Sequence, residues 1–196
     1  MRNPEYTKEE ILKKSGLLFN TRGYKATSIS NITDSTGFTK GAIYRHFKSK
    51  EDLERETLFH LSAQMFEFLQ KRIKAKETAG EKIRAVFEFF ESYATNPPLK
   101  GGCPLLNAAI EADDSHPVLR KAAMKVLNML RAAIIKLLDN GIRYKQIHPA
   151  TDKQFYATII IASLEGALMM SKLEGNNNDM KRVLTHLDEL LQKIEI

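Results

Sequence analysis

Hydrophobic positions recur every three or four residues along most of the chain, which is the spacing of amphipathic α-helices. Strand-like alternation is essentially absent, and no internal repeat is visible. The pattern therefore predicts an all-α protein whose helices are separated by glycine, proline and asparagine signals. Helices are expected at about residues 7–22, 29–36, 39–47, 50–77, 83–95, 104–112, 117–139, 152–173 and 180–194.

Short sequence signals place the ends of these helices. Ala79-Gly80 is expected to interrupt the helical pattern, and Asn140-Gly141 is expected to end the helix that begins near Pro117. A serine or threonine followed three residues later by an acidic residue or glutamine predicts an N-terminal cap. The pairs expected to cap helices in this way are Thr7 with Glu10, Ser49 with Asp52, and Thr151 with Gln154.

Residues 27–53 spell two short helices joined by a glycine. In the first helix, Ile29 and Ile32 form an apolar stripe, and Gly37 supplies a position that can take positive φ at its end. Ile43 anchors the second helix to the core, which leaves the start of that helix exposed. This is the layout of a helix-turn-helix that reads DNA. The exposed residues are Thr39, Lys40, Gly41, Ala42 and Arg45.

The excess positive charge of the chain lies at the same end. Residues 1–50 hold ten basic and four acidic side chains, a net charge of +6, whereas the other 146 residues hold twenty of each. A basic region attracts any polyanion through counterion release, so charge alone predicts affinity without sequence preference. The helix pair is the feature that predicts specificity.

An alternative is open at this point, because two glycine-linked helices occur in many α-proteins and a charge run is usually a solvated face. Three sequence segments favour DNA binding over this alternative. Gly23–Ile29, Gly37–Phe47 and Lys50–Leu53 resemble the N-terminal domain of the TetR family of transcriptional regulators, the TetR/AcrR-like repressors. The resemblance covers about residues 7–55.

The resemblance also assigns roles to individual side chains. It implies that the second short helix reads base edges while nearby polar groups hold the phosphate backbone. The residues implied to face base edges are Ser30, Thr39, Lys40, Gly41, Ala42 and Arg45, with Tyr44 at a base or a phosphate. Those implied to hold the backbone are Thr27, Ser28, His46 and Lys50.

The last two predicted helices indicate a dimer. The helix over 152–173 is apolar on nearly every side, and such a helix must be buried on every side. In a chain of this size a second subunit is the expected cover, and the resemblance also implies a four-helix homodimer interface. The alternative is a monomer whose final helices pack only inward. The expected interface residues are Ile159, Ser163, Gly166, Met170, Val183, Leu187, Leu190 and Leu191.

Aromatic and methionine side chains of the middle helices are candidates for a ligand cavity, because such side chains suit apolar ligands. The same residues are also what an ordinary core would contain. The resemblance implies a small, largely apolar effector in this region. The candidate residues are Phe87, Phe90, Tyr93, Leu106, Ile110, Met124, Leu127 and Met169.

Two smaller features have a simple and a functional interpretation. Cys103 precedes a helix start, where the helix dipole lowers a thiol pKa and favours redox sensing, but a plain buried cysteine is the simpler account. Glu111 and Asp113 lie near Asp114 and would suit a cationic ligand, whereas capping of the next helix by Asp114 or Ser115 is simpler.

Composition excludes several other classes. One cysteine allows no intrachain disulfide, and the polar residues 1–10 do not resemble a signal peptide, so a reducing cytoplasm is expected. The most apolar stretch, 157–171, is shorter than the ~20 residues that cross a bilayer. The five histidines have no metal-ligand spacing, and no P-loop, GxGxxG or nucleophile elbow occurs. We therefore expect neither an enzyme nor a cofactor or metal site.

Together these features predict a helix-turn-helix DNA-binding domain over residues 1–53 and a helical effector-binding and dimerisation domain over 54–196. A helix over 50–77 is expected to join them as a rod roughly 40 Å long. The expected function is transcriptional regulation, with repression as the output and a palindromic operator as the DNA partner.

Overall fold

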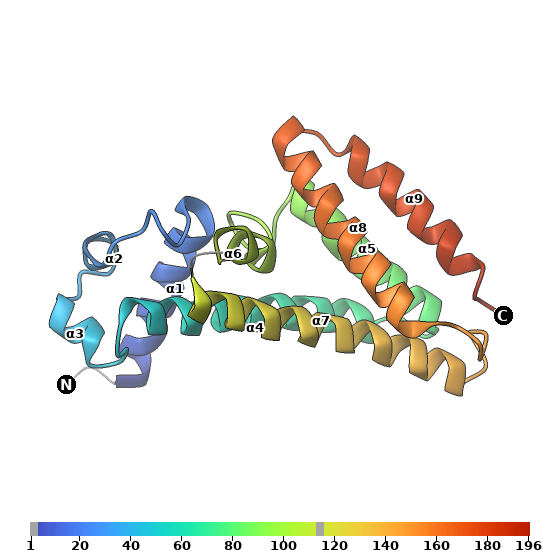
Figure 1. Cartoon of the computed structure of the whole chain (residues 1–196), viewed down its shortest axis with the longest axis horizontal. Helices are drawn as coiled ribbons and strands as arrows, with labels where there is room; N and C mark the ends of the chain where they lie inside the picture. Colours follow the sequence, from blue (N-terminus) through green and yellow to red (C-terminus); the bar gives the residue numbers. More distant parts are fainter. Residues whose placement is uncertain (1–3, 113–115) are drawn as a thin grey trace. The chain divides into compact units, whose positions relative to one another are not determined.

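The structure is a computed structural model that describes residues 4–112 and 116–196. Every regular element within these ranges is an α-helix, which confirms the predicted all-α class (Figure 1). Helix periodicity was therefore a sufficient guide to the class of the fold. The helices are α1 (Pro4–Arg22), α2 (Ile29–Thr36), α3 (Lys40–Tyr44), α4 (Lys50–Lys74), α5 (Ala79–Thr95), α6 (Pro104–Ala112), α7 (Pro117–Arg143), α8 (Lys153–Glu174) and α9 (Asn178–Gln192).

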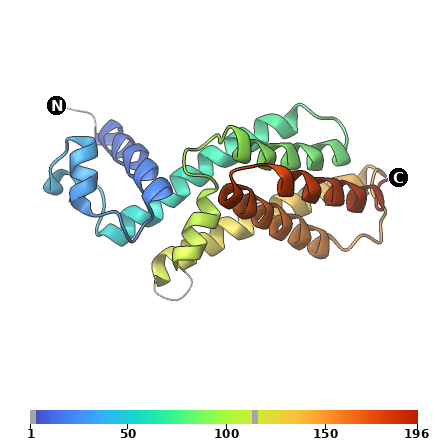
Figure 2. The same cartoon turned by 90° about the horizontal axis from the view of Figure 1, so that it is seen from above.

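The described residues form two compact units that interleave in the sequence. Unit 1 combines residues 4–65 with most of 99–127, so it holds α1 to α3, the first part of α4, α6 and the first part of α7. Unit 2 combines residues 66–98 with 128–196. In Figure 2, α1 to α3 are gathered around the start of α4. The functional division predicted at residue 53 stays a prediction.

Large apolar side chains form the core of unit 1. Phe19 of α1 and Tyr24, in the loop after α1, stack with ring centroids 4.9 Å apart and an interplanar angle of 8°. Burial of each such side chain contributes about 1.5–3 kcal/mol to stability. The other fully buried members include Ile11, Ile32, Ile43, Phe47, Leu53 and Leu58.

The loop between α5 and α6 is fixed against the C-terminal end of α1. The Asn20 amide nitrogen donates hydrogen bonds to the backbone oxygens of Lys100 (2.8 Å) and Gly102 (2.9 Å). The Asn107 amide nitrogen donates to Asn20 Oδ1 at 2.9 Å. Gly101 lies between these contacts with φ +100°, and a Cβ there would lie 2.1 Å from the Asn20 backbone oxygen. Only glycine fits at this position.

Unit 2 contains a layer of three helices. α8 and α9 run antiparallel and side by side, and α5 contacts both (Figures 1 and 2). Arg84 of α5 donates two hydrogen bonds of 2.7 Å to the Glu195 carboxylate and one of 2.5 Å to Asp188 Oδ1. These hydrogen bonds, those to Glu195 most, raise the pKa of Arg84, so the guanidinium stays charged. The Arg84 guanidinium thus links α5 to α9 and to the segment that follows α9.

Two predicted helix starts are wrong. α1 begins at Pro4, so Thr7 lies inside the helix and does not cap it. Proline is favoured in a first helical turn because its missing N–H has no helical partner there. α8 is capped by Asp152, whose side chain accepts from the Phe155 backbone N–H at 3.0 Å, and not by Thr151. The third expected cap is confirmed, because Ser49 Oγ accepts from the Asp52 N–H at 3.1 Å.

Two predicted helix boundaries are also wrong. Ala79-Gly80 does not interrupt the chain between helices, since α5 starts at Ala79. α7 continues through Asn140-Gly141 to Arg143, and Lys145 takes the positive φ (57°) after it. A glycine within a helix costs about 1 kcal/mol relative to alanine, which packing and capping can offset.

Thr78→Ala is expected to lower the free energy of unfolding by about 1 kcal/mol, because it removes the N-cap of α5. Thr78 Oγ1 accepts from the Glu81 N–H at 3.2 Å, and the Glu81 carboxylate accepts from the Thr78 N–H at 2.9 Å. Denaturant titration would measure the change. Thr185→Ala is the control: it replaces a threonine inside α9, where alanine is a better helix former, and little change is expected.

The same cap carries a pH dependence. Hydrogen bonds from Thr78, its backbone N–H above all, lower the pKa of Glu81 in the folded chain. This contribution to stability is therefore complete above the unfolded pKa and is lost as the pH falls through the folded pKa. Thr78→Ala keeps this backbone N–H but removes the hydroxyl that donates to Glu81 Oε2 at 3.1 Å. Only that part of its destabilisation should disappear at acidic pH, and an effect that stayed constant down to complete protonation of Glu81 would contradict this account.

α8 is the one helix in the described ranges that is long and apolar enough, by length and composition, to cross a membrane. Its 22 residues exceed the fifteen-residue apolar stretch recognised in the sequence, because polar residues extend the helix at both ends. Of its most apolar window, 44% is buried within the chain. A core helix of a soluble protein passes the same test, so this property is weak evidence for a membrane.

Candidate DNA-binding surface

α2 is held at both ends by local hydrogen bonds. At its start, the Ser28 N–H donates to Asn31 Oδ1 at 2.9 Å, and the Asn31 N–H donates to Ser28 Oγ at 3.2 Å. At its end, Gly37 takes φ 70° and its N–H donates to the Thr33 oxygen at 2.8 Å. The left-handed conformation at Gly37 is the glycine turn that the sequence predicts. It directs the chain out of α2 and into α3.

α3 is a short helix that is anchored by two buried side chains. Ile43 is fully buried and Phe47, just beyond the helix, is 1% exposed. Thr39 caps the helix, because its Oγ1 accepts from the Ala42 N–H at 3.2 Å. The helix ends at Tyr44, earlier than the predicted residue 47. Its buried and exposed faces are nevertheless those that the spacing predicts.

Most of the predicted DNA-binding residues lie on the exposed surface of α2, α3 and the following turn. Lys40 Nζ lies 6.0 Å from the centre of the Tyr44 ring, and Tyr44 is 39% exposed. An ammonium and a phenol hydroxyl therefore lie together on one helix face. The exposed residues are Ser28, Ser30, Thr39, Lys40, Gly41, Tyr44 and Arg45, and the partly exposed ones are Ala42 and His46.

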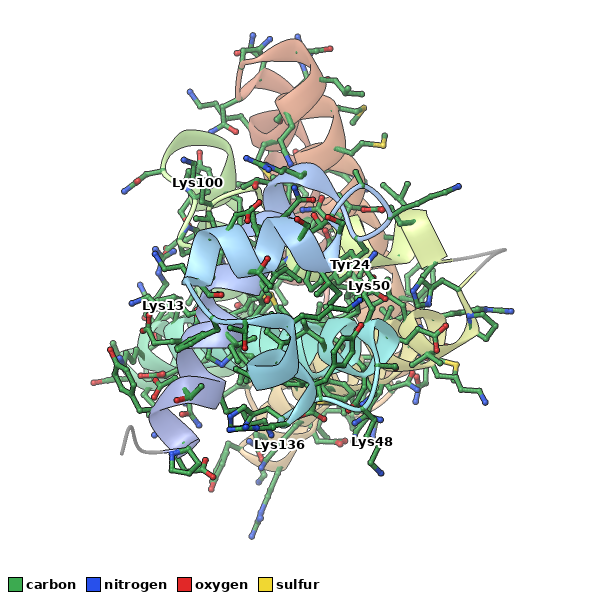
Figure 3. All side chains as sticks on the ribbon, turned by 90° about the vertical axis from the view of Figure 1, so that its left-hand side faces the viewer. Lys13, Tyr24, Lys48, Lys50, Lys100 and Lys136 are labelled. Carbon is green, nitrogen blue, oxygen red and sulfur yellow. The ribbon has the colours of Figure 1, made fainter. Side chains whose placement is uncertain are left out.

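Lys48 adds a charge at the edge of this surface. It is exposed, and in Figure 3 its side chain extends outward from the segment that follows α3. An ammonium at such an edge suits a phosphate oxygen, because it offers charge without requiring a fixed geometry. α3 is therefore flanked by a cationic side chain on its C-terminal side.

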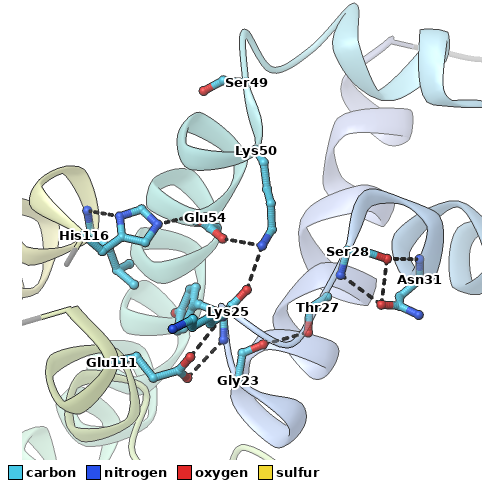
Figure 4. Close-up of polar contacts among 12 residues, drawn as sticks. Gly23, Lys25, Thr27, Ser28, Asn31, Ser49, Lys50, Glu54, Glu111 and His116 are labelled. Atoms are coloured by element: carbon cyan, nitrogen blue, oxygen red, sulfur yellow. Dashed lines mark hydrogen bonds and ion pairs between the residues drawn. The ribbon is translucent and has the colours of Figure 1, made fainter.

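Thr27 and Lys50 differ from the other predicted contacts. Thr27 is fully buried, and its hydroxyl donates to the Gly23 oxygen at 2.7 Å. Lys50 Nζ donates to the Tyr24 oxygen at 2.8 Å and lies 3.1 Å from Glu54 Oε1 (Figure 4). Both groups stabilise the protein itself here, so their implied contact with the phosphate backbone stays a prediction.

Sequence reasoning missed a polar cluster behind the reading helices. Glu54 is 1% exposed, and its carboxylate lies 2.6 Å from His116 Nε2 and 3.1 Å from Lys50 Nζ. The carboxylate of Glu111 accepts hydrogen bonds from two backbone N–H groups in the loop between α1 and α2. Tyr24 lines the same region, where burial, the largest cause, raises the pKa of its phenol. The i,i+4 spacing of Lys50 and Glu54 could have indicated their ion pair. No short-range pattern could have revealed the contacts of Glu54 with His116 or of Glu111 with the loop.

The predicted ligand-binding residues are divided between the two units. Phe87, Phe90, Tyr93 and Met169 belong to unit 2, whereas Leu106, Ile110, Met124 and Leu127 belong to unit 1. The three α5 aromatic residues are buried, and the Phe90 and Tyr93 rings are 6.2 Å apart. Ile110 (61%), Met124 (57%) and Met169 (43%) are exposed. A common pocket for all eight stays a prediction.

The predicted dimer-interface residues also fall into two groups. Leu187 and Leu191 are each 1% exposed in the single chain, so they already belong to the core of unit 2. Their contribution to a dimer interface stays a prediction. The residues with exposed or partly exposed surface are Ile159, Ser163, Gly166 and Met170 of α8, and Val183 and Leu190 of α9.

Cys103 and the acidic residues near Glu111 are the two remaining candidates from the sequence. Cys103 is fully buried at the start of α6. Glu111 contacts the backbone of the same unit, while Asp113, Asp114 and Ser115 lie outside the described residues. No group of three or more histidine, cysteine, aspartate and glutamate side chains placed to hold a metal occurs in the part of the chain that the structure describes.

Two family models match this chain. "Bacterial regulatory proteins, tetR family" matches residues 11–57, and "Tetracyclin repressor-like, C-terminal domain" matches residues 79–187. The first match contains the helix-turn-helix and the second contains α6 and most of unit 2. The resemblance inferred from the N-terminal residues thus extends to the rest of the chain.

Individual transcriptional regulators are also similar to this chain over almost its whole length. The HTH-type transcriptional repressor DhaR of Mycobacterium sp. (strain GP1) is 25% identical over 187 residues, which cover 94% of this chain and 91% of DhaR. A TetR transcriptional regulator from Chloroflexus aurantiacus has a TM-score of 0.92 and 36% identity, with 100% of this chain and 98% of that chain covered. A TetR-family regulator from Cytophaga hutchinsonii also has a TM-score of 0.92, with 29% identity and coverage of 100% and 98%.

Proposed function

The chain belongs to the TetR family of bacterial transcriptional regulators, and we propose that it is a homodimeric repressor that leaves a palindromic operator when a small, largely apolar effector binds. The exposed face of α3 is the observation that carries the proposal. Ile43 packs into the core and anchors this helix, while Lys40 and Tyr44 lie on its exposed face. A rigid helix with mixed donors and a cation on one face suits the major groove.

The side chains around α3 divide into two kinds of contact. Ser30, Lys40 and Arg45 carry donors that can distinguish base edges, and Gly41 and Ala42 allow the backbone to approach closely. Ser28, His46 and Lys48 surround them and would contact phosphate oxygens, which fixes the register of the helix in the groove. Specificity would then come from α3, and most of the affinity from the surrounding positive charge.

A dimer is supported by the outer face of α8. Ile159, Met170 and the small residues Ser163 and Gly166 are exposed or partly exposed there, and a Cβ added at Gly166 would meet nothing within 4 Å. An apolar helix face with small residues allows a second helix to approach closely. A two-fold dimer would bury this face and place two reading helices on one DNA duplex.

The effector would act by preferring one conformation of the dimer. We expect the effector to bind more tightly to a conformation in which the spacing of the two α3 helices does not match the operator. Effector binding would then shift the dimer toward that conformation and lower its affinity for DNA. The buried aromatic side chains of α5 are the part of the predicted ligand set that best suits an apolar molecule. A regulator that acts in this way on chromosomal DNA would work in the cytoplasm.

Selection of random duplexes by the purified protein is expected to enrich a palindrome. Its half-sites should be separated by about one turn of DNA, roughly 10 base pairs, or a multiple, because the two reading helices face the same side of the duplex. Affinity for the enriched sequence should fall steeply with salt, since phosphate contacts release counterions. Mobility-shift titrations at several salt concentrations would measure both properties.

Sedimentation of the same preparation supplies the control for the dimer. At micromolar concentration it should show a species of two 22.3 kDa chains. Salt-sensitive binding without any enriched sequence would contradict specific reading. A lone half-site bound by a monomer would contradict the dimer while leaving the role of α3 intact.

A further inference from the structure

The loop between α1 and α2 determines where the reading helices stand. It contains Gly23 and Tyr24 and leads to Ser28, the residue that caps α2. Tyr24 is fully buried, with its ring stacked on Phe19. Because α2 and α3 follow within a few residues, a shift of this loop would move the exposed face of α3.

A single carboxylate from α6 binds the backbone of this loop. Glu111 Oε1 accepts from the Tyr24 N–H at 3.0 Å, and Glu111 Oε2 accepts from the Lys25 N–H at 3.0 Å. Figure 4 shows the carboxylate lying against the loop beside Gly23. Glu111 stands 87 residues after Tyr24, in the region that matches the C-terminal family model. Both oxygens are used, so the hydrogen bonds fix the orientation of two successive N–H groups.

The loop backbone is also built to receive this carboxylate. Gly23 has φ +97°, and a Cβ on it would lie 2.7 Å from Glu111 Oε1. On the far side of Tyr24, its carbonyl accepts a hydrogen bond of 2.8 Å from Lys50 Nζ. The N–H and C=O of Tyr24 are thus held by opposite charges from two different helices, α6 and α4.

The negative charge of Glu111 has two unfavourable effects at this position. It lies in the last turn of α6, where the helix dipole disfavours a negative charge. It also adds negative charge to a unit that binds a polyanion. Neither effect helps the helix or DNA binding, whereas the two backbone hydrogen bonds do favour a carboxylate here.

We propose that Glu111 is a positioning residue for operator recognition. It contacts no DNA, and it holds the α1–α2 loop so that α2 and α3 present their exposed face in the conformation that fits the operator. The proposal rests on the proposed function of α3. It also makes α6 a direct support of the reading helices, in addition to the chain connection through α4.

Glu111→Gln tests the proposal because positioning and charge predict changes of opposite sign. The substituted side chain loses one acceptor and places an amide N–H against a backbone N–H, so a smaller fraction of molecules holds the loop correctly. If that fraction falls to about a third in each subunit, the operator affinity of the dimer falls about tenfold, because both subunits must hold the loop correctly. Loss of one negative charge by itself would strengthen binding to any DNA.

The expected result is therefore about tenfold weaker binding to the selected operator, with equal or slightly tighter binding to unrelated duplex of the same length. Glu51→Gln is the charge control, since Glu51 is an exposed carboxylate of the same unit. It should leave operator affinity unchanged or raise it slightly. The amide proton resonances of Tyr24 and Lys25 should move upfield in Glu111→Gln but not in Glu51→Gln, as their charge-assisted hydrogen bonds weaken.

Glu111→Asp keeps the charge but shortens the side chain by one methylene, so it should also weaken operator binding. This variant replaces Glu111→Gln in the test if Glu111→Gln does not fold. Unchanged operator affinity in a folded variant whose two amide resonances have moved would overturn the proposal. Equal loss on operator and unrelated DNA would overturn it as well. Absence of any preferred sequence for the wild-type protein would instead contradict the proposed function.

Discussion

Tyr44→Ala is expected to weaken binding to the selected operator by at least about 30-fold. Each lost contact of a reading helix costs about 1–3 kcal/mol, and a dimer loses it at both half-sites, which gives about 2–6 kcal/mol in total. Lys40→Ala should have an effect of the same order, because Lys40 and Tyr44 lie on the same exposed face with the ammonium 6.0 Å from the ring. Fluorescence anisotropy titration with the operator duplex would measure both.

Lys13→Ala is the matched control for the loss of a positive charge. Lys13 is an exposed residue of α1, and no DNA contact is assigned to it (Figure 3). It should reduce affinity for operator and unrelated duplex alike, and by less. Tyr44→Ala and Lys40→Ala should leave thermal unfolding nearly unchanged, since exposed substitutions usually alter stability by less than about 0.5 kcal/mol. Operator affinity at the wild-type level in both variants would refute the assignment of α3.

Gly101→Ala is expected to lower the free energy of unfolding by about 2–5 kcal/mol, the largest stability change among our predictions. The left-handed φ of +100° disfavours any side chain, at about 1–2 kcal/mol. The new Cβ would also lie 2.1 Å from the backbone oxygen of Asn20, and relief of such overpacking costs about 1–3 kcal/mol more. Thermal and denaturant unfolding would measure the loss.

Gly37→Ala separates the two causes. Gly37 also has positive φ (70°) and belongs to the same unit, but a Cβ there would meet nothing within 4 Å. It should therefore show only the conformational cost of about 1–2 kcal/mol. If both alanine variants lost the same stability, contact with Asn20 would play no part at Gly101.

The helices were predictable because each depends on residues close in sequence. The apolar stripe of Ile29 and Ile32, of which Ile32 is fully buried and Ile29 partly exposed, is visible in the spacing alone, and Gly37 stands where the turn needs it. Helix ends were less predictable, because several groups compete for each cap. Asp152 and Thr151 both have a suitable side chain, and only the path of the chain determines which one bonds the Phe155 N–H.

The exposed face of α3 was predictable for the same local reason, since Ile43 determines which neighbouring residues point outward. The supports of that face were not. From the sequence, Lys50 was predicted to contact the phosphate backbone. In the structure its ammonium donates a hydrogen bond to the carbonyl of Tyr24, 26 residues earlier. Glu111 acts across 87 residues, and Leu187 was assigned to a dimer face although it is buried within its own chain. Such contacts depend on tertiary packing that periodicity does not contain.

The close approach of Gly23 and Glu111 has a consequence for how the protein can evolve. Any side chain at position 23 would occupy the space of the Glu111 carboxylate, and a shorter residue at position 111 would leave two loop N–H groups without their acceptor. Neither position can drift alone without disturbing the loop. Residues 23 and 111 are therefore expected to vary together among related chains, because a larger side chain at position 23 requires the carboxylate at position 111 to be replaced or moved.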